Sequence, residues 1–244
     1  MKPLIKTHLL RGLLTGLLAL ATVLPSASAD VGVITLPAGL NPGDPYRLIF
    51  VTSAGMDATA GTFVPYDAFA AASAAASVEL NAMATTWRAL LSVPTSQPLP
   101  GAREHTETSP TTSFPNNIPI YNLQGQLVAV DYADLWNGSI GNAIRYDEFG
   151  ASVTTPVWTG TATNGFGIAS RQVSNTFVQV GDPMAINNTW IGFNGGTVLD
   201  SSEVHSIYAV SNTIIAVPEP SSALLLAGSG LLLALRRRRA AAAR

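Results

Sequence analysis

Tyr46-Arg47-Leu48-Ile49-Phe50-Val51-Thr52-Ser53 is the stretch that decides how this chain begins to fold. It is rich in aliphatic and aromatic side chains, and a Pro/Gly cluster before it and Gly55 after it mark its ends, so we predict a buried strand. A helix is predicted next, over about 65–83, because Pro65 suits a first helical turn and Asp67 complements the helix dipole there. Side chains three or four residues apart would form its buried stripe: Phe69, Ala72, Ala76, Leu80 and Met83.

The rest of the chain reads as short apolar runs separated by turn residues. These runs predict strands over 86–92, 157–161, 172–180, 190–193 and 204–211, and a hairpin formed by 118–122 and 126–130. Between them, residues 93–117 are rich in Pro, Ser and Thr and predict a surface loop without regular structure. One strand, one main helix and many short strands predict an α+β fold in which the helix packs on a mostly antiparallel sheet.

The first 29 residues have the three parts of a signal peptide. Three basic side chains open it: Lys2, Lys6 and Arg11. An apolar run of 13 residues follows over 12–24, and Ala27 and Ala29 supply the small side chains that signal peptidase accepts. An uncleaved anchor is the alternative, but the run is shorter than the roughly 20 residues that span a bilayer. We therefore predict a signal peptide over 1–29 and an exported globular domain over 30–217.

A second apolar run lies near the end of the chain, over 223–235. It is preceded by Val217-Pro218-Glu219-Pro220 and followed at once by four arginines: Arg236, Arg237, Arg238 and Arg239. As a helix its 13 residues would rise about 20 Å, less than the roughly 30 Å hydrocarbon core, so the span is short. Because the arginines should stay on the cytoplasmic side, the proline motif would face outward. We predict that 217–244 is a separate segment with a short transmembrane helix.

These three elements, in this order at the C-terminus, resemble the PEP-CTERM sorting family of Gram-negative bacteria that make exopolysaccharide or biofilm. The resemblance implies that signal peptidase and an exosortase, a membrane cysteine protease, act on the chain during export. It also implies a precursor tethered in the inner membrane and a product at the cell surface or outside the cell. An ordinary tail anchor is the alternative, because a short apolar segment alone would serve that purpose.

The middle of the chain resembles the endostatin-like branch of the C-type-lectin fold, which occurs in some bacterial exported proteins. The matching segments follow the family's order: 48–53, 87–92, 120–125, 134–139, 157–161 with Asn164-Gly165, and 207–211. The resemblance implies that fold, although Ala209 stands where family members often carry a cysteine. The Glu-Pro-Asn or Gln-Pro-Asp signature of sugar-binding lectins is absent from the predicted domain.

The composition of the predicted domain excludes several classes of function. Residues 30–217 hold five arginines, no lysine and 14 acidic residues, a net charge of −9, which leaves no electrostatic footprint for nucleic acid. The chain has no cysteine, which excludes thiol catalysis, thiolate metal sites and disulfides. We expect the domain to be held together by core packing alone.

An acidic cluster is the strongest candidate for a metal site. Its weak calcium candidates are Asp131, Asp134, Asp147 and Glu148, with Asn142 between them, and hard oxygen ligands on a loop suit calcium. No EF-hand spacing is present, and a solvated acidic loop explains the cluster as well. We therefore predict neither a metal nor a cofactor.

Four tryptophans are candidates for stacking on a sugar ring: Trp87, Trp136, Trp158 and Trp190. Trp87 and Trp158 lie in apolar runs and are predicted to be core residues. Trp136 stands beside the turn residues Asn137-Gly138, so we expect it to be exposed and to be the possible ligand contact. Its replacement by alanine is accordingly expected to destabilise the domain far less than that of Trp158.

The remaining candidate chemistry is sparse. His105 and His205 have no metal-ligand spacing, and no Gly-x-Ser-x-Gly elbow accompanies them, so we predict that the chain is not an enzyme. The sequence favours a non-catalytic surface or extracellular-matrix protein associated with exopolysaccharide. A carbohydrate-binding, lectin-like module and a matrix hydrolase are the alternatives.

Overall fold

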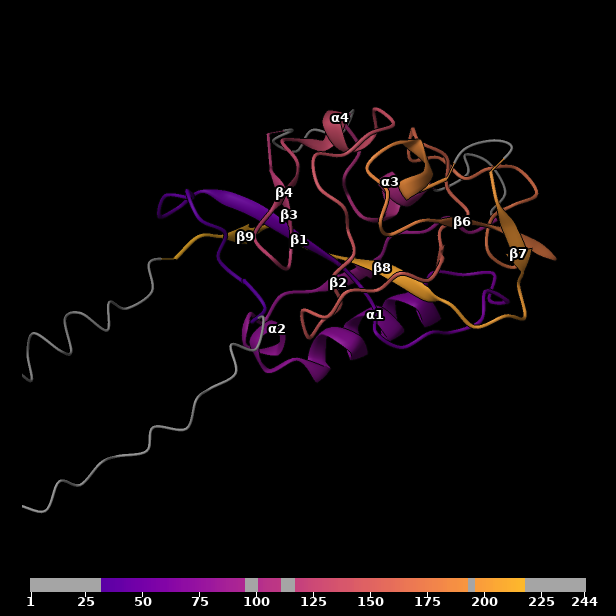
Figure 1. Cartoon of the computed structure of the whole chain (residues 1–244), viewed down its shortest axis with the longest axis horizontal. Helices are drawn as coiled ribbons and strands as arrows, with labels where there is room; N and C mark the ends of the chain where they lie inside the picture. The colour runs from indigo at the N-terminus through magenta and orange to yellow at the C-terminus, as the bar shows by residue number, and fades with distance from the viewer. Residues whose placement is uncertain (1–31, 95–100, 111–116, 193–195, 218–244) are drawn as a thin grey trace, which may run out of the picture. The chain divides into compact units, whose positions relative to one another are not determined.

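A mixed sheet organises the chain in the computed structural model, which describes residues 32–94, 101–110, 117–192 and 196–217 (Figure 1). Nine strands are present within these residues: β1 (Pro45–Val51), β2 (Trp87–Ala89), β3 (Ile120–Asn122), β4 (Leu127–Ala129), β5 (Val157–Trp158), β6 (Phe177–Gly181), β7 (Val198–Asp200), β8 (Ser206–Ser211) and β9 (Ile214–Ile215). The main path runs β4-β3-β1-β8-β5-β6-β7, while β2 pairs with β8 and β9 pairs with β1. The pairs β1–β3 and β5–β8 are parallel and the others antiparallel, and together with few helices this confirms an α+β fold.

β1 lies inside the sheet and is buried on both faces, as its continuous apolar run predicts. Successive side chains of a strand point to opposite faces, so Leu48 and Phe50 enter one core cluster while Ile49 and Val51 enter the other. The first cluster also contains residues of the long helix, and the second contains residues of the short helix that follows β4. β1 is therefore the strand on which two cores are built.

The helices cover both faces of the sheet. They are α1 (Val64–Ala76), α2 (Val78–Ala82), α3 (Ala102–His105) and α4 (Tyr132–Leu135), with a 3-10 helix, η1, over Asn188–Trp190. α1 packs on β2 and β8, and α4 belongs to the opposite core cluster (Figure 1). The arrangement is a sheet with a helical layer on one side and short helices and loops on the other.

The predicted helix over 65–83 forms, but it breaks once. Ser77 has an extended backbone, and its hydroxyl accepts a hydrogen bond from the Leu80 N–H, so it ends α1 and caps α2. The predicted stripe is wrong for α1: Ala72 and Ala76 are exposed, while the buried face carries Tyr66, Ala70, Ser73 and Ala74. A helix made mostly of alanine gives little amphipathic contrast, and Tyr66, which is fully buried, decides which face turns inward.

The short strands of the structure agree only in part with the runs that predict them. The hairpin is confirmed as β3 and β4, with Gly125 at positive φ in its turn. β2, β5 and β8 fall within predicted runs, while β6 overlaps only the second half of the run predicted over 172–180 and ends one residue beyond it. The predicted strand over 190–193 is wrong for its described residues, 190–192, because Trp190 ends the 3-10 helix η1, which Asn187 caps by accepting a side-chain hydrogen bond from the Thr189 N–H. β7 and β9 are short and were not predicted.

The predicted surface loop over 93–117 is also corrected. α3 lies within it, and among the residues described there Ala102, Thr106, Thr108 and Ser109 are buried. The signal peptide over 1–29 and nearly all of the segment over 217–244 fall outside the described residues. Within the described part of the chain, no helix has the length and apolar character to cross a membrane.

Gly160 is the position where a side chain should cost most. Its φ of +58° lies in the left-handed region, and a Cβ there would lie 2.7 Å from the Gln172 Cα and 3.0 Å from the Ser92 carbonyl oxygen. We expect Gly160→Ala to lower the free energy of unfolding by about 2–4 kcal/mol, from the backbone conformation and the steric overlap together. Gly39 also has positive φ but has nothing within 4 Å, so Gly39→Ala is the control. Equal losses in chemical denaturation would contradict the role of packing at Gly160.

Candidate functional site

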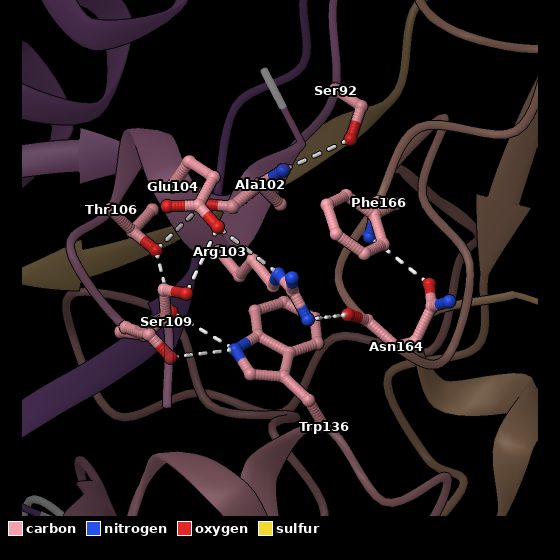
Figure 2. Close-up of polar contacts among 10 residues, drawn as sticks. Ser92, Ala102, Arg103, Glu104, Thr106, Ser109, Trp136, Asn164 and Phe166 are labelled. Carbon is pink, nitrogen blue, oxygen red and sulfur yellow. Dashed lines mark hydrogen bonds and ion pairs between the residues drawn. The ribbon is translucent and has the colours of Figure 1, made fainter. Parts of the chain in front are cut away.

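Trp136 lies in the core and is not exposed. It follows α4 directly, is 7% exposed, and its ring centre lies 5.9 Å from that of Trp190. Its Nε1–H is shared between the carbonyl oxygen of Thr108 at 3.0 Å and the Oγ1 of the same residue at 3.1 Å (Figure 2). The expectation of an exposed Trp136 is therefore wrong, because residues 28 positions earlier in the chain fold over the indole.

Arg103 fills the space beside this tryptophan (Figure 2). Its guanidinium carbon lies 3.6 Å from the ring centre of Phe166, and its Nη1 donates to the Asn164 carbonyl oxygen at 3.2 Å. Gly165 brings the turn into contact with both side chains, since a Cβ there would lie 2.8 Å from Trp136 Cδ2 and 2.7 Å from Arg103 Cβ. One face of the partly exposed Phe166 ring is thus covered by Arg103, so Trp136, Arg103 and Phe166 pack against one another and leave no open site between them.

A second arginine holds the same segment against β1. The Arg47 side chain is 3% exposed, and its Nη1 donates to the Thr106 carbonyl oxygen at 2.6 Å. Burial lowers the pKa of the Arg47 guanidinium from its usual value. The central carbon of this guanidinium also lies 5.3 Å from the centre of the Tyr132 ring. Sequence reasoning missed this residue because an arginine in a strand gives no local indication of a partner 59 positions away.

The other tryptophans have the places that their apolar neighbours predict. Trp87 is 4% exposed and Trp158 is fully buried, which confirms both as core residues. The Trp158 Nε1–H donates to the Met56 carbonyl oxygen at 2.9 Å, and Trp190 is fully buried against Tyr208. None of the four indoles offers an open face for stacking on a sugar ring.

The weak calcium candidates are divided between two turns. Asp131 caps α4 by accepting from the Asp134 N–H at 2.7 Å, and Asp134 in turn accepts from the Val130 N–H. In the second turn, Asp147 accepts from two backbone N–H groups, and the Glu148 carboxylate accepts from the N–H and the hydroxyl of Ser53. Across the described ranges, no group of three or more His, Cys, Asp or Glu side chains is placed to hold a metal ion.

We expect thermal melts of the protein in calcium and in a chelator to coincide, because these carboxylates already accept hydrogen bonds from the backbone. Calcium bound at 100 times its dissociation constant would instead raise the melting temperature by roughly 5–10 °C. Differential scanning calorimetry with each additive measures the difference. A melting temperature several degrees higher in calcium would overturn this expectation and restore the acidic cluster as a metal site.

Each histidine of the predicted domain pairs with a carboxylate. His105 Nε2 lies 2.8 Å from Asp67 Oδ1, and its ring stacks on Phe63. His205 Nε2 lies 3.2 Å from Glu203 Oε2, and its ring meets Trp158 edge to face. Neither imidazole has a hydrogen bond to a serine or threonine hydroxyl within the described residues.

A cleft of about 540 Å³ opens beside β6. The described residues that line it are mostly polar or small: Thr154, Pro156, Gln179, Val180, Gly181, Asp182, Thr189, Gly192, Gly196 and Thr197. Aromatic side chains, which would be needed for stacking on a sugar ring, are not among these lining residues. The described lining of the cleft therefore lends no specific support to carbohydrate binding.

The C-terminal end of the sheet is the place where fold and sorting segment meet. β8 and β9 pair in succession with β1, and the ladder continues to Ala216, whose N–H donates to the Asp44 carbonyl oxygen at 2.9 Å. The Ala216 carbonyl oxygen accepts from the Gly43 N–H at 2.8 Å, and the residue is 3% exposed. Val217, the next residue, is 72% exposed. Among the described residues, the last backbone hydrogen bonds of this ladder are thus those of Ala216, two residues before Pro218.

The remaining predicted site residues lie outside the described ranges: Ala27, Ala29, Pro218, Glu219, Pro220, Arg236, Arg237, Arg238 and Arg239. Comparison with known families shows that residues 216–239 match the PEP-CTERM protein-sorting motif. This confirms the resemblance that rested on the proline motif, the apolar run and the arginines. No curated protein matches the chain.

Proposed function

We propose that this chain is a non-catalytic cell-surface or extracellular-matrix protein that an exosortase processes at its C-terminal segment during export. The single observation that carries the proposal is the sorting motif over 216–239. It begins at Ala216, the last residue with hydrogen bonds to the sheet in the described part of the chain. The motif indicates a precursor anchored in the membrane and a destination at the cell surface. The folded residues before it are then the cargo that is delivered.

The contacts of the ionisable side chains support a role without catalysis. Both histidines are engaged by carboxylates and aromatic rings, and the acidic candidates accept backbone hydrogen bonds. A general base needs a free lone pair within reach of a nucleophile, and neither imidazole has such a partner within the described residues. These arrangements give a hydrolase no support.

An association with exopolysaccharide or biofilm, and an endostatin-like or C-type-lectin-like fold, remain parts of the proposal. The mixed sheet with α1 on one face is compatible with that fold class. Carbohydrate binding is disfavoured as the leading function because Trp136 is buried and Phe166 is covered on one face by Arg103. We therefore expect the protein to contribute to the matrix through its surface as a whole.

Fractionation of the native host tests the proposal. In wild-type cells, we expect a shortened protein in the surface or extracellular fraction, and in cells without the exosortase we expect the longer protein in the inner membrane. Glycan-array binding of the released protein, with and without calcium, tests the lectin alternative in parallel. Release that is unchanged without the exosortase would refute the sorting role, and strong glycan binding would favour the lectin-like module.

A further inference from the structure

The last strand of the fold has one bonded edge and one open edge. The Ala216 N–H donates to Asp44, and bonded and non-bonded pairs alternate along an antiparallel ladder. Ile215 stands opposite Pro45, so it belongs to the non-bonded set, and Pro45 has no N–H to offer. The N–H and C=O of Ile215 therefore point away from β1.

The outer side of this strand is unpaired within the described residues. β5 and β2 line the outer side of β8, but β2 pairs no further than Trp87 opposite Ser211. The last hydrogen bond on that side joins the Asn212 N–H to the Thr86 carbonyl oxygen. Beyond it, the backbone groups of Ile215 and Val217 have no hydrogen-bond partner in the described part of the chain. We call residues 213–217 the open edge.

The side chains of the open edge alternate in exposure. Ala216 is buried in the core, whereas Ile215 is 53% and Val217 72% exposed, and Thr213 is exposed as well. An exposed strand edge with apolar side chains on alternate residues is the surface to which an extended segment of another protein can add as a further strand. Natural proteins protect such edges with charges, prolines or very short strands. Residues 213–217 contain no charge and no proline, and the short length of β9, two residues, is the one such feature here.

The open edge lies directly beside the segment that is processed. Residues 218–222 alone separate Val217 from the apolar run that begins at Ala223, and five extended residues reach at most about 18 Å. A protease that holds the proline motif must therefore come within that distance of the sheet. Because Ala216 is fixed in the ladder, the part of the protease that faces the upstream side of the motif meets the open edge itself.

We propose that the exosortase docks on the open edge by pairing an extended segment of its own with residues 213–217 while it holds the motif. This inference rests on the proposed function, since it concerns the same processing step. Backbone hydrogen bonds to Ile215 and Val217 supply the binding, and contacts with their side chains supply selectivity. The folded domain is then part of the recognised substrate, and the motif is not recognised alone.

The test uses the full chain in its native host, with pulse-chase measurement of the conversion of precursor to product. Ile215→Pro removes one outward N–H that the domain's own ladder does not use, and proline is tolerated at a strand edge whose N–H faces solvent. We expect conversion to be roughly two- to tenfold slower, the effect of one lost backbone hydrogen bond of ordinary net strength. Ile215→Val keeps the N–H and the branched side chain, and it should be processed at the wild-type rate.

A second variant keeps the proposal testable if Ile215→Pro disturbs folding. Five Gly/Ser residues and then a valine, inserted between Val217 and Pro218, leave β9 intact and keep a Val-Pro-Glu-Pro sequence, but they separate the open edge from that sequence. We expect slower conversion here too. Wild-type rates for the insertion and for a normally melting Ile215→Pro would overturn the docking. So would a wild-type dimer that Ile215→Pro dissolves without changing conversion, since a second copy would then occupy the edge.

The docking and the proposed function fail in different ways. If replacement of Pro218, Glu219 and Pro220 blocks conversion while the open-edge variants convert normally, the sorting role stands and the docking is wrong. If that replacement has no effect, the sorting role itself is wrong and the docking falls with it.

Discussion

Replacement of Trp158 with alanine is expected to lower the free energy of unfolding by about 3–5 kcal/mol, the usual range for a large buried aromatic side chain. Trp158 is fully buried in β5, between β6 and β8, and its Nε1–H donates to the Met56 carbonyl oxygen at 2.9 Å. Truncation opens a cavity in the first core cluster and removes one of the two hydrogen bonds that the Met56 carbonyl oxygen accepts, the other coming from the His205 N–H at 3.1 Å. Chemical denaturation of the purified protein measures the loss.

Trp136→Ala should lower the free energy of unfolding by an amount similar to that for Trp158→Ala. This reverses the expectation that was drawn from the turn-forming neighbours of Trp136. The Trp136 indole is 7% exposed, and both its hydrogen bonds go to Thr108. Phe177, at the start of β6, is 55% exposed and serves as the matched control, since Phe177→Ala should stay within roughly 0.5 kcal/mol of wild type. A loss for Trp136→Ala as small as that of the control would contradict the buried position of the indole.

The contrast between the two tryptophans shows which parts of the fold could be predicted from sequence. Trp158 lies in an apolar run, and a local run of that kind predicts a buried strand. Trp136 is covered by residues 28 positions away, which no local pattern indicates. The same limit explains α3, which Arg47 holds from 59 positions away across a segment that reads as a loop.

The helix shows a second limit, which is weak contrast. Alanine and serine fill α1, so several stripes fit the same spacing, and the packing of Tyr66 selects one of them. The break at Ser77 follows from its capping bond to Leu80, a role that serine can equally leave unused in a helix. The existence and the approximate length of the helix could therefore be predicted from the sequence, but its buried face and the break at Ser77 could not.

The candidate site divides along the same line. The sorting segment is a local pattern of proline motif, apolar run and arginines, so sequence alone identified it, and the family comparison confirms it. The acidic cluster is also local, but a metal site depends on whether carboxylates are free, and here Asp131 and Asp147 accept backbone hydrogen bonds. The open edge depends on which strands stop pairing, and β9, with two residues, is too short to be predicted.

Replacement of Pro218, Glu219 and Pro220 together with alanine is expected to abolish processing and to leave the uncut protein in the inner membrane. Two prolines keep the backbone extended and restrict the residues before them, and a protease cleft binds an extended strand. Without them, residues 218–220 could continue the helix that is predicted for the apolar run, which would remove the extended substrate. Mass spectrometry of surface and extracellular protein should then find no chain that ends near residue 220.

The apolar run itself makes this effect large, because it is suited to a temporary stop in the membrane. As the predicted helix it would be about 10 Å shorter than the hydrocarbon core, and Gly228 and Gly230 would each weaken that helix by about 1 kcal/mol relative to alanine in water. We expect such a segment to hold the precursor long enough to be cut, and the cut would then be the step that releases the domain. Ser221→Ala with Ser222→Ala is the matched control, since it changes adjacent residues and leaves the motif intact. Trimming and release of the motif variant at the wild-type rate would show that the proline motif does not direct sorting.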